Sequence, residues 1–259
     1  MKLKTLLILI CFFSFFNIHA QTDSIELKIL NYNIRFGELA SLEELAEFIK
    51  REDPDVVALQ EVDIRTYRER APDQNGKDFI TELGYRTGLL SAFGKTIPYK
   101  GGYYGIGILS KFPLALVERI YLPKTEHGKE QRALLLADIE YKEGSYFTFV
   151  STHLDFTNTK ERQIQVQKLN EVLLNRPYPI IVAGDFNARP DSEEIEVGMS
   201  QWMQISNNEK ATIPAKNPKS QIDYIFSYPK DGWEKIRDST YNIQLSDHLP
   251  QSATVKIKN

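Results

Sequence analysis

Apolar and polar residues alternate between residues 25 and 33, with Ile25, Leu27 and Ile29 on one face, and this pattern predicts a half-buried strand that ends at Asn33. The segment 41–53 predicts a helix, because its apolar residues recur at helical spacing and its start has the spacing of a capping box. The apolar residues at helical spacing are Leu42, Leu45, Ala46 and Ile49, and the capping box is formed by Ser41 and Glu44. Pro54 prevents the helix from continuing.

Other segments repeat this mixture of strands and helices. The nearly continuous apolar block 55–61 predicts a central strand with Glu61 at its carboxyl end. Further strands are predicted at 105–110, 132–141, 146–153, 178–186, 221–227 and near the carboxyl end of the chain. Helices are predicted at 77–83, ending at Gly84, and at 158–175, capped by Asn158, whereas 190–220 is polar and weakly patterned. Hairpins mixed with helical crossovers predict one α/β domain with helices outside packed sheets.

The first twenty residues have the pattern of a secretory signal peptide. Lys2 and Lys4 precede an apolar block that ends at the small residue Ala20. This block is shorter than the ~20 apolar residues that cross a bilayer, so a retained anchor is the weaker interpretation. We therefore predict cleavage after residue 20, a single domain over 21–259, and a secreted or periplasmic protein.

Loss of this segment changes the charge and the cysteine content. The formal net charge of −3 becomes −5 without Lys2 and Lys4. Cys11 is the only cysteine, so the mature chain would have no disulfides, thiolate chemistry or cysteine zinc sites. Mild acidity argues against a protein that binds nucleic acid through its whole surface, but bound divalent cations would reverse the charge locally.

Polar residues follow the predicted strands at the points where scaffolds display functional sites. Six segments occur in the order NYNIRFG, PDVVALQEVD, STHLDF, GDFNARP, QIDYIF and SDHLP. Together they resemble the motifs of the endonuclease/exonuclease/phosphatase superfamily, over about residues 27–255. The chain is most similar to the compact secreted bacterial metal-dependent hydrolases of that superfamily. The resemblance implies a deoxyribonuclease I-like fold, with two packed mixed sheets flanked by helices in four α/β/β/α layers.

The resemblance also implies a divalent cation held by Asn33, Glu61 and Asp247. Their oxygen ligands suit Mg²⁺ first, and also Mn²⁺ or Ca²⁺, better than zinc. Taken alone, Asn33 and Glu61 have ordinary alternatives, a turn cap and a solvated acid.

The implied catalytic residues are His153, Asp185, Asn187, Asp223 and His248. In this scheme Asp185 orients or deprotonates the attacking water, and Asn187 donates a hydrogen bond to the phosphoryl oxygen. An Asx turn at the strand exit is the alternative for these two residues. Asp223 orients His248 and raises its basicity, and His153 stabilises charge on the phosphate.

Two arginines match further positions of the family pattern. Arg132 and Arg162 are candidate contacts for substrate, with structural salt bridges as the alternative. The sequence leaves two substrate classes open, namely nucleic acid cut by an extracytoplasmic nuclease, and the phosphoesters of lipid or sugar head groups. A non-catalytic binding module is a third hypothesis. No stable protein partner is implied, and we expect a monomer.

Overall fold

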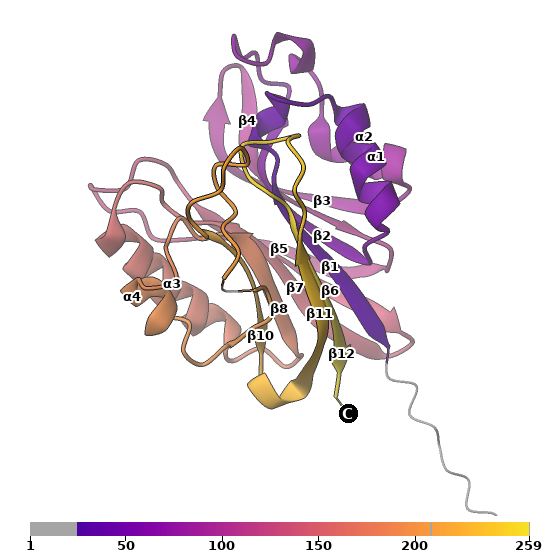
Figure 1. Ribbon diagram of the computed structural model, residues 1–259, viewed down its shortest axis with the longest axis vertical. Coiled ribbons are helices and arrows are strands. Elements are labelled where there is room, and N and C mark those ends of the chain that lie inside the picture. Colours follow the sequence, from indigo (N-terminus) through magenta and orange to yellow (C-terminus); the bar gives the residue numbers. More distant parts are fainter. Residues whose placement is uncertain (1–24, 208, 259) are drawn as a thin grey trace, which may run out of the picture.

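Two six-stranded sheets face each other in the computed structural model, which describes residues 25–207 and 209–258 (Figure 1). The predicted signal peptide, residues 1–20, lies outside this range. The first sheet has the strand order β11-β12-β1-β2-β4-β3. Its strands are β1 (Glu26–Asn33), β2 (Val56–Ile64), β3 (Leu90–Tyr99), β4 (Gly102–Ser110), β11 (Trp233–Thr240) and β12 (Gln251–Ile257).

The second sheet has the order β5-β6-β7-β8-β10-β9. Its strands are β5 (Leu114–Tyr121), β6 (Ala133–Lys142), β7 (Ser145–His153), β8 (Ile180–Asp185), β9 (Met203–Gln204) and β10 (Asp223–Tyr228). Each sheet contains one parallel pair, β1 with β2 and β7 with β8, among antiparallel neighbours. Both sheets are therefore mixed, as predicted.

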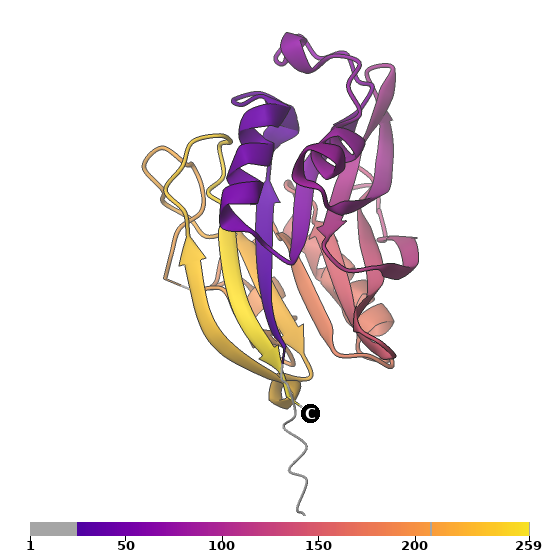
Figure 2. The same cartoon turned by 90° about the vertical axis from the view of Figure 1, so that its right-hand side faces the viewer.

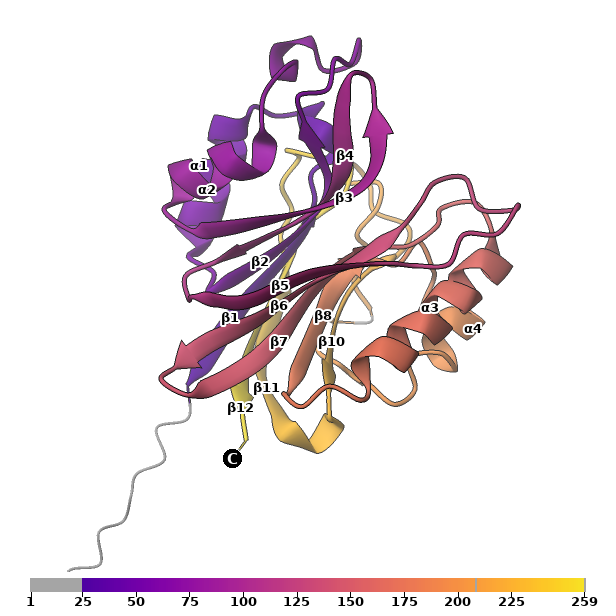
Figure 3. The ribbon, with the colours of Figure 1, turned by 180° about the vertical axis from the view of Figure 1, so that it is seen from behind.

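Helices cover the outer faces of the two sheets. Helices α1 (Leu42–Glu52) and α2 (Phe79–Thr87) pack on the first sheet, whereas α3 (Thr159–Leu173) and α4 (Glu193–Glu196) lie together on the second (Figure 3). Short 3-10 turns are η1 (Arg35–Gly37), η2 (Pro72–Gln74) and η3 (Lys230–Gly232). Helix α1 connects β1 to β2 and α3 connects β7 to β8, because each parallel pair needs a crossover. The result is the predicted four-layer α/β/β/α arrangement, with α1 and α2 on one side and α3 and α4 on the other in Figure 1. Figure 2 looks onto the first sheet from the side covered by α1 and α2.

Apolar residues from both inner sheet faces form the central core. Ile29, Ile108, Leu135, Phe149 and Val255 belong to this fully buried cluster. The α1 capping box is present as predicted, with Ser41 accepting from Glu44 N. Burial on both faces explains the continuous apolar runs of the interior strands.

The second helix corrects the sequence prediction. It passes through Gly84 and ends at Thr87, where it is capped by Gly88, whose φ of +76° is the left-handed conformation that favours glycine after a helix. Gly84 is instead a site of close approach, since a Cβ there would lie 3.0 Å from Leu89 O. Within the described part of the chain, no helix has the length and apolar character needed to span a membrane.

Candidate active site

Strand ends from both sheets bring the predicted catalytic residues together. Asn33 ends β1 in the first sheet, while His153 and Asp185 end the parallel neighbours β7 and β8 in the second. His153 is in register with Asp185, and Asp185 is in register with Asp223 on β10. The site therefore lies where the carboxyl ends of strands from two sheets meet.

A buried polar layer joins the sheets beneath the site. Asn31 donates from Nδ2 to Gly184 O at 3.2 Å and accepts from Gln60 Nε2 at 3.0 Å. Ser151 donates to Leu59 O at 3.2 Å. Buried polar groups are stable only when hydrogen-bonded, so these contacts fix the relative position of the two sheets at this end.

Glu61 reaches the site from a bulge, and this corrects the predicted end of β2. The strand continues to Ile64, but its register with β4 shifts between Gln60 and Val62. Glu61 has a φ of +57°, and such bulges redirect a side chain. Asn33 Nδ2 donates to Glu61 Oε1 at 3.2 Å and to Asp185 Oδ2 at 3.1 Å.

The predicted pair of Asp223 and His248 is in hydrogen-bonding distance. His248 Nδ1 lies 2.9 Å from Asp223 Oδ2, and both side chains are buried. Because a carboxylate can only accept, Nδ1 carries the proton and Nε2 faces Asp185 Oδ2 at 3.8 Å. Burial opposes protonation, but the charge and hydrogen bond of Asp223 raise the His248 pKa to about 9.

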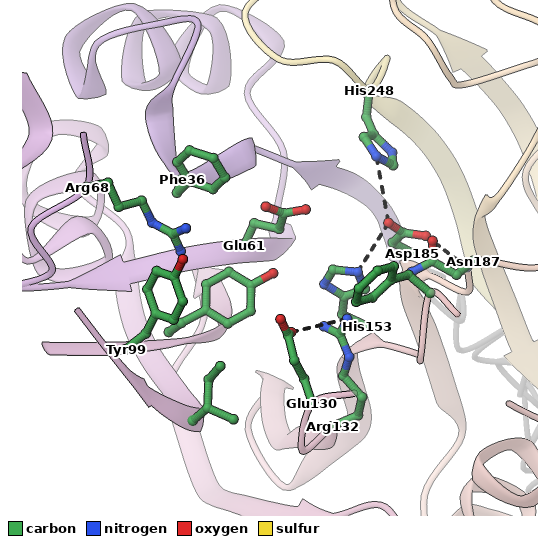
Figure 4. Close-up of a pocket in the computed structure, with 13 residues that line it drawn as sticks. Phe36, Glu61, Arg68, Tyr99, Glu130, Arg132, His153, Asp185, Asn187 and His248 are labelled. Atoms are coloured by element: carbon green, nitrogen blue, oxygen red, sulfur yellow. Dashed lines mark hydrogen bonds and ion pairs between the residues drawn. The ribbon is translucent and has the colours of Figure 1, made fainter. Parts of the chain in front are cut away.

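Asp185 lies between the two site histidines. His153 Nε2 is 3.4 Å from Asp185 Oδ2 on the side opposite His248 (Figure 4). Burial, together with the nearby charge of Asp223, raises the pKa of Asp185 above its ordinary value. Burial and the positive charges of Arg132 and His248 hold the His153 pKa well below its usual range. At neutral pH the cluster thus pairs a neutral imidazole with a protonated one.

Asn187 closes a local turn and also lines the cavity. Its backbone N donates to Asp185 Oδ1 at 2.9 Å, which is the Asx turn considered from sequence. Its side-chain Nδ2 donates to Leu154 O at 3.1 Å, leaving a second N–H. The φ of +50° is one that asparagine tolerates better than most residues. A turn residue and a substrate donor are therefore compatible assignments here.

Glu61, His153, Asp185, Asn187 and His248 line a cavity of about 290 Å³. Arg132 is also in its wall, 2% exposed, with no hydrogen-bond partner for Nε among the described residues. The sequence reasoning assigned no role to the remaining wall, because Tyr99 and Tyr104 lie outside the six motif segments and the aromatic residues inside them, Phe36 and Phe156, were not singled out. That wall is formed by Phe36, Arg68, Ile97, Tyr99, Tyr104, Glu130 and Phe156.

Four predicted residues lie outside the cavity wall. Asn33 and Asp223 are hydrogen-bonded to residues that line it, whereas Asp247 and Arg162 are not. Asp247 forms an ion pair with Arg35, so its carboxylate would have to exchange that partner to bind a cation. Arg162 is bound through Nε to the buried Glu194 at 2.8 Å, which is the salt bridge considered from sequence. One group of potential metal ligands in the described residues is Asp185, Asp223 and His248, whose atoms lie within 4.8 Å of one another.

A model of the Endonuclease/Exonuclease/phosphatase family matches residues 30–248. The uncharacterized protein YbhP of Escherichia coli is 26% identical over 257 residues, covering 92% of this chain and 99% of its own. Exodeoxyribonuclease III of Haemophilus influenzae is 25% identical over 184 residues, covering 66% of this chain and 61% of its own.

Solved structures share the fold. A conserved protein of unknown function from Enterococcus faecalis superposes with a TM-score of 0.74 at 20% identity, over 90% of this chain and 100% of its own. A mannosyl-6-phosphatase from Bacteroides thetaiotaomicron superposes with a TM-score of 0.69 at 16% identity, over 88% of this chain and 99% of its own. At these identities the likeness establishes the deoxyribonuclease I-like architecture.

Proposed function

Because this chain belongs to the Endonuclease/Exonuclease/phosphatase family, it is a phosphoester hydrolase, and we propose that it requires a divalent cation, with Mg²⁺ as first choice. The observation that carries the proposal is the cluster in which Asp185 lies between His153 and the Asp223–His248 pair. A binding module would not need a carboxylate and two imidazoles at one end of a cavity. Hydrolysis needs them for proton transfer and charge stabilisation.

The residues around Glu61 suit a cation of this kind. Glu61 and Asp185 share one neutral amide donor, Asn33, and Glu61 has no cationic partner within 4.0 Å among the described residues. Their oxygens form a hard ligand set without thiolates. Excess negative charge in a buried site favours binding of a positive ion.

We assign the cation to Glu61 and Asn33, with Asp247 as a ligand only if it releases Arg35. Asn33 presents its amide nitrogen to the carboxylates, and its oxygen accepts from Arg35 N at 3.0 Å. A bound cation favours the amide oxygen on the carboxylate side instead, because cations bind oxygen. When bound, the ion would polarise the phosphate and stabilise charge on the leaving oxygen.

Asp185 is the proposed base for the attacking water. Its raised pKa makes it a better proton acceptor than an ordinary carboxylate at neutral pH. The hydrogen bonds from Asn33 and from Asn187 N hold both of its oxygens in place. The water oxygen attacks phosphorus, the P–O bond to the leaving oxygen breaks, the proton of the water passes to Asp185, and the leaving alkoxide takes a proton from solvent to become the alcohol.

The histidines and Arg132 are proposed to stabilise the phosphate. His248 is protonated, so Nε2–H donates to a phosphoryl oxygen while Asp223 fixes the tautomer. His153 stays neutral and donates without adding charge. Arg132, whose Nε–H has no hydrogen-bond partner in the described part of the chain, is the proposed guanidinium contact.

A chromogenic assay tests the function with residues 21–259. We expect hydrolysis of p-nitrophenyl phosphate or of bis-p-nitrophenyl phosphate with Mg²⁺, loss of activity in EDTA, and recovery when Mg²⁺ or Mn²⁺ is restored. Plasmid DNA belongs in the same panel, because the similarity to exodeoxyribonuclease III favours a nuclease as second candidate. Activity that survives EDTA would refute metal dependence, and no hydrolysis of any ester would refute the assignment as an enzyme.

We further propose that the protein is exported. The support is the basic start, the short apolar block and the small Ala20. Sequencing the amino terminus of the protein from the periplasm or medium should give Gln21 as first residue. An intact Met1 in a membrane fraction would indicate a retained anchor instead.

A further inference from the structure

The cavity has two chemically different ends (Figure 4). His153, Asp185 and His248 lie at one end, and Phe36, Arg68 and Tyr99 lie at the other, with Glu61 between them. If the phosphate is cleaved at the histidine end, the aromatic end is left for the rest of the substrate. We call the cavity end formed by Phe36, Arg68, Tyr99 and Tyr104 the aromatic subsite.

Arg68 gives the aromatic subsite a fixed shape. Its guanidinium lies 3.9 Å from the ring centre of Phe36 and 4.3 Å from that of Tyr99. It also forms two contacts with the buried Asp63, at 2.5 Å from Nε and 3.0 Å from Nη2. A guanidinium held by two rings and a carboxylate is preorganised, so the subsite needs little ordering to bind a ligand.

The arginines of the cavity have their charge balanced. Arg68 is paired with Asp63, and Arg132 lies 3.4 Å from Glu130. Beside Phe36, Arg70 contacts Glu38 at 2.5 Å. A nucleic-acid backbone is bound by several cations without such partners. The cavity therefore lacks the charge pattern that would hold a polymer of phosphates along its wall.

The polar groups in and beside the aromatic subsite can form hydrogen bonds with hydroxyl groups. The Tyr99 and Tyr104 phenols and the Glu130 carboxylate lie in the wall beside apolar Ile97 and the ring of Phe156. A hydroxyl both donates and accepts, so it can donate to a carboxylate and accept from a phenol. A second phosphate would find no unpaired arginine at the aromatic subsite, because Arg68 is already paired with Asp63. A long acyl chain would leave these polar groups unpaired.

The volume of the cavity also favours a compact substrate. The cavity of about 290 Å³ is slightly smaller than the roughly 300–1,000 Å³ typical of small-molecule pockets. Resting on the phosphoester hydrolase function above, we propose that the aromatic subsite binds the alcohol part of a phosphoester of one compact, uncharged polyhydroxy alcohol, of sugar or cyclitol size. Tyr99 is then a specificity-determining residue.

This chemistry has two sources, which the substrates distinguish. A hexose 6-phosphate represents the free monoester, and phosphatidylinositol vesicles represent the diester of a lipid head group. We expect one of them to be hydrolysed with a kcat/KM at least tenfold above that of glycerol 2-phosphate, with no cleavage of plasmid DNA. p-Nitrophenyl phosphate and its bis ester report whether the hydrolase is active at all.

Tyr99→Ala is the decisive variant. We expect it to raise KM for the preferred polyol ester about tenfold, because it removes a stacking face and a hydroxyl. The inhibition constant of inorganic phosphate should stay within twofold, because phosphate occupies the histidine end. Tyr99→Phe keeps the ring and should raise KM less. Tyr85→Ala, at a tyrosine 90% exposed on α2, is the matched control and should change neither constant.

A separate groove provides the test for a polymer substrate. Arg65 and Lys100 line it beside Tyr99, outside the cavity. Lys100→Ala should leave hydrolysis of the polyol ester unchanged. The inference is overturned if chromogenic esters are cleaved but both polyol esters are not, if DNA is cleaved and Lys100→Ala weakens that cleavage, or if Tyr99→Ala leaves KM unchanged. If no ester at all is cleaved, the hydrolase function itself has failed.

Discussion

Replacing Asp223 by asparagine isolates the charge of one carboxylate. The substitution keeps the size of the side chain and removes the charge that lies 2.9 Å from His248 Nδ1. Neither residue fills the apolar core, so the fold should survive. An amide also offers both a donor and an acceptor, and it can hold the imidazole in the other tautomer.

The expected loss follows from the His248 pKa. A rise from 6.5 to about 9 corresponds to about 3 kcal/mol favouring the protonated imidazole. At pH 7.5 the native residue is therefore almost fully protonated. Without Asp223, burial is opposed only by weaker charges, the pKa falls to about 6.5 or lower, and about one tenth or less stays protonated. The loss of protonated His248 lowers kcat/KM about tenfold. The loss of the orientation that Asp223 gives to the imidazole brings the expected total decrease in kcat/KM to roughly 10²–10⁴-fold.

Two measurements check this reasoning. In the metal-free protein, an NMR titration of the His248 ring should give a midpoint near 9 for the native chain and at least two pH units lower for Asp223→Asn. With metal, the alkaline decline of kcat/KM should move in the same direction. Because the folded protein raises the His248 pKa, protonation of His248 stabilises the fold. This stabilisation is complete below pH 6.5 and is lost as the pH rises through about 9.

The result that refutes the pairing is equally definite. An unchanged His248 midpoint in Asp223→Asn, or a loss below threefold, would show that the carboxylate does not act through the imidazole. If the two residues form one unit, Asp223→Asn combined with His248→Ala should be little worse than His248→Ala alone. Multiplicative losses would indicate independent roles.

Three further substitutions test the cation site and the scaffold. Glu61→Ala should abolish activation by Mg²⁺ without unfolding the protein, whereas the control Glu126→Ala, in an exposed loop, should keep that activation. A titration of activity with Mg²⁺ measures both, and near-native activation of Glu61→Ala would contradict the assignment. Gly184→Ala should destabilise the protein by about 2–4 kcal/mol in urea unfolding, because its Cβ would lie 2.3 Å from Thr152 O; an unchanged midpoint would contradict this. Asn158→Ala should cost about 1 kcal/mol by removing the α3 cap while kcat stays constant, and a large loss of kcat would link α3 to catalysis.

The sequence predicted the eight interior strands of the two sheets and missed the four at the edges. Interior strands are covered on both faces and have long apolar runs. The edge strands β5 and β11 are mostly exposed, with only Trp233 fully buried between them, and β9 has two residues. A strand whose side chains are mostly exposed on both faces has no strong alternation of apolar and polar residues. The hydrophobicity of its sequence therefore does not reveal it.

The candidate site divides in a similar way. Asp223 and His248 were predicted as a pair from motifs, and the structure brings them into contact. Arg35 was not predicted to contact Asp247, because the contact depends on the turn after β1, where Arg35 has a φ of +44°. The aromatic wall, too, depends on tertiary packing: Phe36 and Tyr99 come from separate segments and meet only around Arg68.

The order in which the chain is synthesised has a consequence for where activity first becomes possible. Strand β1 lies between β2 and β12, so the first sheet stays open on one side until the last strand is made. His248 precedes β12 by only a few residues and emerges from the ribosome equally late. A nascent chain therefore has neither a complete sheet nor a complete catalytic cluster. If the protein is exported as proposed, this topology would keep the unfinished polypeptide from hydrolysing phosphoesters inside the cell that makes it.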